Sequence, residues 1–207
     1  MTRVAYQNRR VSPAQAVRAK TVLRLLAPVL LLCSSLFPGY CAAQQERPTE
    51  AQVKAAYVYN FGKFVRWQST APATESFDIC VLGKNSFGSA LQNTVSGEKI
   101  EAKSIVVRNT TIMQNDARCR ILFISSSEES RLKSILTLAQ QSNSLTVSDI
   151  PGFAQRGGMI ELVSHEGRIR FEVNLAAAGN AGLTVSSELL KVAVKVIGTN
   201  QAGEIGR

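Results

Sequence analysis

The hydrophobic pattern of the chain becomes helical just after residue 49. Mostly apolar side chains recur there at intervals of three and four positions, which places them on one side of a helix. Thr49 is a suitable N-cap, and Gln52 completes a capping box three positions later. The pattern predicts a helix over residues 50–66, ended by Trp67. The positions of the predicted stripe are Val53, Ala56, Tyr57, Asn60, Phe61, Phe64 and Val65.

Short apolar runs then alternate with helical periodicity. The predicted strands are residues 77–82, 104–108, 119–125 and 145–148. The predicted helices between them are residues 87–94 and 126–141. Strands that alternate with helices favour a parallel sheet covered on both faces.

The period changes near the C-terminus. Residues 159–163 and 168–173 flank a turn at 164–167, and the second run alternates strictly between apolar and charged side chains, which is typical of a β-hairpin. A short turn or helix over 174–181 and a last helix over 186–197 are expected to follow. The predicted fold class is therefore α/β: a single domain with a mostly parallel sheet, helices on both faces and a C-terminal antiparallel hairpin.

The first 43 residues have the layout of a secretory signal peptide. They hold six basic and no acidic side chains, an apolar run at 25–37, and small residues at Cys41 and Ala43 before the predicted cut. An uncleaved membrane anchor is the main alternative, but the run contains Pro28 and is shorter than the about 20 residues that a span needs. We therefore predict a signal peptide at 1–43, a lead-in at 44–49, the α/β domain at 50–197, and a disordered tail at 198–207. The protein is expected in the periplasm.

Removal of the leader changes the charge of the chain. The whole chain has 24 basic and 15 acidic side chains and a formal charge of +9, whereas only 18 basic residues remain beyond the leader. The remaining basic residues form no run and are not interleaved with aromatic residues, so nucleic acid is not an expected partner.

Two of the four cysteines leave with the leader. The pair that remains, Cys80 and Cys119, lies at or beside two predicted strands, and an even count in an exported chain favours a disulfide. Such a bond would close a loop of roughly 40 residues and contribute on the order of 3–4 kcal/mol. Two buried free thiols are the alternative. Two lone cysteines and one histidine offer no closely spaced metal ligands, so no metal site is expected.

Groups able to perform chemistry are scarce. His165 is the only histidine and lies in the predicted hairpin tip, and no G-x-S-x-G motif is present. Residues 83–88 resemble a phosphate loop only loosely, and we interpret them as a turn with a helix cap. We expect neither catalysis nor a cofactor. His165, Arg168 and Arg170 form a candidate anion site; the alternative is a solvated edge strand whose charges prevent pairing between sheets.

Several segments, in order, resemble the YfiR-like family of periplasmic proteins over roughly residues 50–197. The segments that carry the resemblance are 53–67 (VKAAYVYNFGKFVRW), 79–83 (ICVLG), 119–124 (CRILFI), 145–149 (LTVSD), 157–160 (GGMI), 168–175 (RIRFEVNL) and 181–190 (AGLTVSSELL).

The resemblance implies a regulator. Members repress an inner-membrane diguanylate cyclase by binding its periplasmic sensor domain, and an outer-membrane lipoprotein can sequester them. The output is the level of cyclic-di-GMP, and hence biofilm and exopolysaccharide. Members are able to form homodimers, and Cys80–Cys119 matches a family disulfide. Some members have a further cysteine pair near residues 149–161, which this chain lacks.

The residues themselves indicate where a partner would bind. Tyr59, Lys63, Arg66 and Trp67 lie at the end of the first predicted helix, and an exposed aromatic residue beside arginine is typical of an interface hot spot. The alternative is that Trp67 covers the core. Two other functions stay open: a sensor of a small anionic ligand that acts on another membrane receptor, and a hydrolase.

Overall fold

The computed structural model describes residues 47–68, 75–112 and 119–198. The predicted signal peptide, the lead-in up to residue 46 and the tail beyond residue 198 lie outside the described residues.

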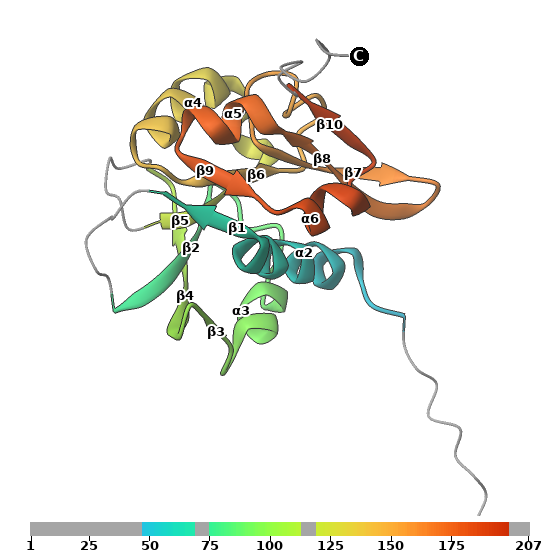
Figure 1. The fold of residues 1–207 in the computed structure, drawn as a ribbon. Coiled ribbons are helices and arrows are strands. Elements are labelled where there is room, and N and C mark those ends of the chain that lie inside the picture. Colours follow the sequence, from blue (N-terminus) through green and yellow to red (C-terminus); the bar gives the residue numbers. More distant parts are fainter. Residues whose placement is uncertain (1–46, 69–74, 113–118, 199–207) are drawn as a thin grey trace, which may run out of the picture. The chain divides into compact units, whose positions relative to one another are not determined.

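Within the described residues, eight strands form one sheet in the order β10-β8-β7-β6-β5-β2-β4-β3, and β1 pairs with β9 in a separate ribbon (Figure 1). All pairs in the large sheet are parallel except β7 with β8 and β3 with β4. The strands are β1 (Val65–Trp67), β2 (Ser76–Leu82), β3 (Lys99–Ile100), β4 (Lys103–Thr110), β5 (Cys119–Ile124), β6 (Leu145–Ser148), β7 (Ile160–His165), β8 (Arg168–Asn174), β9 (Leu183–Val185) and β10 (Lys195–Ile197).

Helices cover both faces of this sheet. Successive side chains of the central strand β2 point to opposite faces, and those on both faces are buried. Phe77, Ile79 and Val81 join the larger core with α2 and α3, whereas Cys80 and Leu82 join a smaller core under α4. Figure 1 shows α2 and α3 together and α4 apart from them. The predicted fold class is confirmed. The helical segments are α2 (Glu50–Phe64), α3 (Ala90–Val95), the 3₁₀ helix η1 (Ser126–Arg131), α4 (Leu132–Gln141), α5 (Leu175–Asn180) and α6 (Ser187–Val192).

The first helix begins as predicted and ends early. Thr49 and Gln52 form the predicted capping box. The predicted end at residue 66 is wrong, because α2 stops at Phe64 and β1 follows at once. Pairing of β1 with β9 supplies backbone hydrogen bonds that another helical turn would have excluded.

The predicted last helix, 186–197, is also wrong in its second half. Helix α6 ends at Val192, and Ala193 is extended. The N–H of Val194 donates to the carbonyl of Phe171, and β10 then pairs parallel to β8. The β-branched residues of this segment prefer the strand once a neighbouring edge is available.

Other boundaries differ in smaller ways. The helix predicted at 126–141 divides into η1 and α4, and the one predicted at 87–94 begins at Ala90. The short strand β3 was not predicted. Its turn to β4 uses Glu101 and Ala102 with positive φ angles of 51° and 63°, a conformation for which the sequence shows none of the usual Gly or Asn signals.

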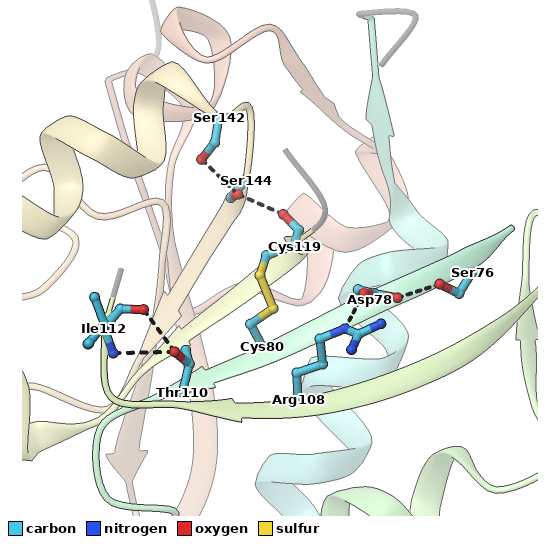
Figure 2. The surroundings of a disulfide bond; sticks show 9 residues. All are labelled: Ser76, Asp78, Cys80, Arg108, Thr110, Ile112, Cys119, Ser142 and Ser144. Atoms are coloured by element: carbon cyan, nitrogen blue, oxygen red, sulfur yellow. Dashed lines mark hydrogen bonds and ion pairs between the residues drawn. A yellow bond between two sulfur atoms is a disulfide. The ribbon is translucent and has the colours of Figure 1, made fainter. Parts of the chain in front are cut away.

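The predicted disulfide is confirmed. Cys80 of β2 and Cys119 of β5 are bonded, with 5.6 Å between their Cα atoms (Figure 2). Beside the bond, Ser144 donates a hydrogen bond of 2.7 Å to the carbonyl of Cys119. The bond links two adjacent strands of the sheet, one of which begins at the cysteine itself.

Candidate functional site: a basic hollow at the end of the first helix

Three of the four residues predicted to bind a partner line one hollow. Lys63, Arg66 and Trp67 lie along its wall, while Tyr59 lies behind it, buried in the core. The hollow has a volume of about 640 Å³ and is named here the Lys63 hollow. Its lining residues are Gly62, Lys63, Val65, Arg66, Trp67, Lys99, Ile100 and Glu101.

Trp67 both covers the core and faces the hollow. Its ring packs edge-on against Phe77, with 5.5 Å between centroids, and its indole N–H donates to the carbonyl of Asn143 at 3.0 Å. The guanidinium of Arg120 lies 5.7 Å from the indole centroid. A tryptophan held by three contacts presents a rigid surface, which lowers the entropy lost on binding.

Lys63 is positioned by Tyr59. The ammonium lies 4.3 Å from the centre of the Tyr59 ring, and the Tyr59 hydroxyl donates to Glu98 at 2.5 Å. Hydrogen bonding to the Tyr59 side chain raises the pKa of Lys63, with a smaller contribution from the charge of Glu98. Lys63 therefore remains a cation at neutral pH.

Residues from the β3–β4 hairpin complete the hollow. Lys99 and Glu101 line it together with Lys63 and Arg66, although they are distant in sequence. Sequence reasoning missed Lys99 because the strand that carries it has only two residues and an atypical turn. The lining thus carries three cations and one carboxylate, so the hollow favours an acidic partner.

Gly62 is the point at which α2 lies closest to the core beneath the hollow. A Cβ atom on this residue would lie 2.6 Å from Cδ1 of Ile100 and 3.2 Å from the Phe77 ring. The glycine therefore allows the last turn of α2 to approach the sheet closely.

The second predicted site lies at the tip of the β7–β8 hairpin and is only partly assembled. His165 stands opposite Arg168 in the ladder, but only Arg168 and Arg170 line the adjacent hollow of about 600 Å³. Arg47 just before α2, the carboxylate residue Glu50 at its start and Tyr57 in its middle line it as well. The structure therefore gathers three arginines, with His165 outside the hollow. Strand β10 pairs only with Glu172–Asn174, so Arg168 and Arg170 lie on the part of β8 that β10 leaves uncovered.

A third possible binding site lies beyond the carboxyl ends of two neighbouring strands whose connections run to opposite faces of the sheet. Many open α/β sheets bind ligands in the crevice at such a point. Here β2 leads to α3 on one face and β5 leads to α4 on the other. The loops bond to each other: the N–H of Lys84 donates to Ser127 at 3.0 Å, and the Ser125 hydroxyl donates to the carbonyl of Lys84. Residues 83–88 make the predicted turn, in which Asn85 accepts from the N–H of Phe87 at 2.9 Å. The predicted helix cap within this segment is wrong, because α3 begins only at Ala90 and Ser89 is its N-cap. Hydrogen bonds between the two loops therefore span the crevice in which a ligand would bind.

Two further properties concern the described residues alone. They contain no group of three or more His, Cys, Asp or Glu side chains arranged to hold a metal ion. No helix in this part of the chain is both long and apolar enough to cross a membrane.

The fold and its surfaces define an α/β domain, closed by a disulfide, whose hollows carry fixed basic and aromatic groups. The chain belongs to the YfiR/HmsC-like family, whose sequence profile matches residues 51–194. At the level of the family, the match supports a periplasmic regulator of a diguanylate cyclase system. The disulfide fits that oxidising compartment.

Other comparisons add less. No curated protein matches the chain significantly. Two solved structures that it resembles are a conserved domain protein from Vibrio cholerae and the ABC domain, in complex with L-Trp, from Streptococcus pneumonia. Each is 12% identical with a TM-score of 0.48, and the matches cover 69% and 71% of this chain. The chain spans 59% and 60% of the length of those two structures.

Proposed function

We propose that this chain binds the periplasmic sensor domain of an inner-membrane diguanylate cyclase and represses it, which lowers cyclic-di-GMP and the output of biofilm and exopolysaccharide. The observation that carries the proposal is the family match, which runs from the first turn of α2 to the start of β10. Repression requires that the chain bind one state of the receptor more tightly than the other.

The Lys63 hollow is the surface that we propose for this contact. It offers a rigid indole, with Lys63, Arg66 and Lys99 in the same lining, at the end of α2, which carries one of the most specific segments of the family resemblance. Interfaces are commonly centred on a desolvated aromatic residue and an arginine. An acidic surface on the receptor would complement the three cations.

The experiment is a deletion of the gene with cyclic-di-GMP quantified, followed by complementation. We expect the level to rise on deletion and to fall again with the full chain, but not with a chain that lacks the predicted signal peptide at 1–43. An unchanged level on deletion would contradict the proposal. An equal fall without residues 1–43 would contradict the periplasmic site of action.

Charge reversal tests the location. We expect Lys63→Glu with Arg66→Glu to abolish complementation while the protein still accumulates. The matched control reverses the charge of two exposed lysines on the α4 side of the fold, Lys84→Glu with Lys133→Glu. This variant should complement the deletion fully. Equal activity of the two double variants would remove the Lys63 hollow from the proposal.

The second candidate function is a sensor of a small anionic ligand. It is favoured by the hollow that Arg47, Arg168 and Arg170 line together. If it holds, inorganic phosphate or citrate should raise the melting temperature of the wild-type protein, and Arg168→Ala with Arg170→Ala should remove that shift without affecting receptor binding. The absence of any shift would contradict it.

A further inference from the structure

In the part of the chain that the structure describes, one strand of the large sheet has an open outer edge. Strand β4 spans Lys103–Thr110, but β3 pairs only with Lys103 and Ser104. Among residues 47–68, 75–112 and 119–198, no strand pairs with the remaining stretch, 105–110, on that side. We name this stretch the β4 edge; it lies at the bottom of Figure 1.

The register shows which backbone groups face outward. The N–H of Gly83 donates to the carbonyl of Thr110, so Thr110 directs its backbone groups toward β2. Backbone groups alternate in direction along a strand. Ile105, Val107 and Asn109 therefore direct their N–H and C=O groups away from the sheet, ready to pair with another strand.

The β4 edge lacks the devices that usually prevent strand addition, which are proline, bulges and free lysines. Its sequence, IVVRNT, is rich in β-branched residues. Its one charge, Arg108, forms an ion pair of 2.5 Å with the buried Asp78 of the neighbouring strand (Figure 2). Ile105 and Val107 are only partly buried against the larger core, and their exposed surface would be covered by an added strand.

A second copy of the chain is the competing occupant. Two β4 strands related by a two-fold axis must pair residues of equal parity, since opposite side chains share a face. Centring the axis on Val107 pairs Asn109 with Ile105 of the second copy over five residues, and Ser104 beyond them already pairs with its own Lys99. Pairing of this kind depends on the concentration of the chain itself and needs no receptor, so it is an outcome of the test.

The β4 edge is continuous with the Lys63 hollow. Lys99 and Ile100 of β3 line that hollow and also pair with the first two residues of β4.

We infer that the β4 edge accepts an extended segment of the cyclase's periplasmic domain, which adds to the sheet as a strand. The inference rests on the proposed function, because it assigns part of the same receptor to a second contact. The segment should have about five residues, with β-branched or apolar side chains toward the α3 face.

The test uses a substitution that removes one outward N–H and leaves the inner ladder intact. Asn109 is exposed and its N–H points outward, so Asn109→Pro keeps the β2–β4 bonds while it blocks strand addition. Asn109→Ser is the matched control, because it changes the same side chain and keeps the N–H.

The probe is the purified periplasmic domain of the cyclase whose removal abolishes the rise in cyclic-di-GMP. By isothermal titration calorimetry, Asn109→Pro should weaken binding at least tenfold and Asn109→Ser less than twofold. Both variants should melt within a few degrees of the wild type. Amide hydrogen exchange by NMR should show new protection at Ile105, Val107 and Asn109 on binding, since the alternate residues are already bonded to β2.

The outcomes separate the two proposals. Wild-type affinity of Asn109→Pro, or unchanged exchange of the three amides in the saturated complex, would overturn the inference and leave the proposed function standing. Failure of the wild-type chain to bind the domain would overturn the proposed function and this choice of occupant. Protection of the same amides that depends on the chain's own concentration, without receptor, would identify a second copy and overturn the inference.

Discussion

Loss of the Cys80–Cys119 bond should strongly destabilise the domain. The two residues are 39 positions apart, and the loop between them contains α3, β3 and β4. In the chain-entropy description, a cross-link over such a loop restricts the unfolded state by about 4 kcal/mol at 25 °C. That is a large share of the about 5–15 kcal/mol by which a typical domain is stable.

The perturbation is the double variant Cys80→Ala with Cys119→Ala, compared with the oxidised and the chemically reduced wild type. The reduced protein keeps both sulfur atoms, so it loses the cross-link without a change in core volume. Cys80 is buried among Leu82, Leu122 and Ile124, so the alanine variant should be slightly less stable than the reduced protein.

The assay is urea unfolding followed by circular dichroism, after mass spectrometry has verified the bond in the oxidised sample. With a urea slope of about 2 kcal/mol/M, a loss of about 4 kcal/mol lowers the midpoint by about 2 M. If the three midpoints agree within about 0.5 M, the loop closed by the bond does not contribute as reasoned here.

Two further predictions follow from the core and from one ion pair. Gly62→Ala should lower the free energy of unfolding by about 1–2 kcal/mol in urea titrations, because the new methyl would lie 2.6 Å from Cδ1 of Ile100 and 3.2 Å from the Phe77 ring, which outweighs the higher helix propensity of alanine; an unchanged stability would show that the Ile100 side chain or α2 moves aside at little cost. Burial lowers the pKa of Lys54, but its bonds to Asp149, at 2.7 Å, and to Glu50 outweigh this effect and raise the pKa above 10.5. The stability from Lys54 is therefore fully present below pH 10.5 and is lost as pH rises through the raised pKa, so the difference in melting temperature between wild type and Lys54→Met should shrink above pH 10.5. A constant difference would contradict this account.

Local patterns identified the elements whose signals lie within a few neighbouring residues. The capping box of Thr49 and Gln52 fixed the start of α2, and the strict alternation around Phe171 identified the hairpin. The apolar run at β2 predicted a strand buried on both faces. The family resemblance, carried by α2 and the closing segments, supplied the class of function.

Elements that depend on a distant partner were missed. Residues 195–197 have the composition of a helix end or a strand, and only pairing with β8 decides between them. The same holds for β1, whose three residues continue a helical stripe until β9 provides a ladder.

The residues of the candidate site also fall into those that the sequence placed and those that only the tertiary structure placed. The sequence by itself determined that Lys63, Arg66 and Trp67 lie together, because they are close along one helix end. It also determined the pair of cysteines available for a bond. Only the tertiary structure brought Lys99 beside them, buried Tyr59, and left the β4 edge open. Those facts depend on contacts between residues far apart in the chain, and a helical or alternating pattern records only which side of an element is apolar, not what packs against it.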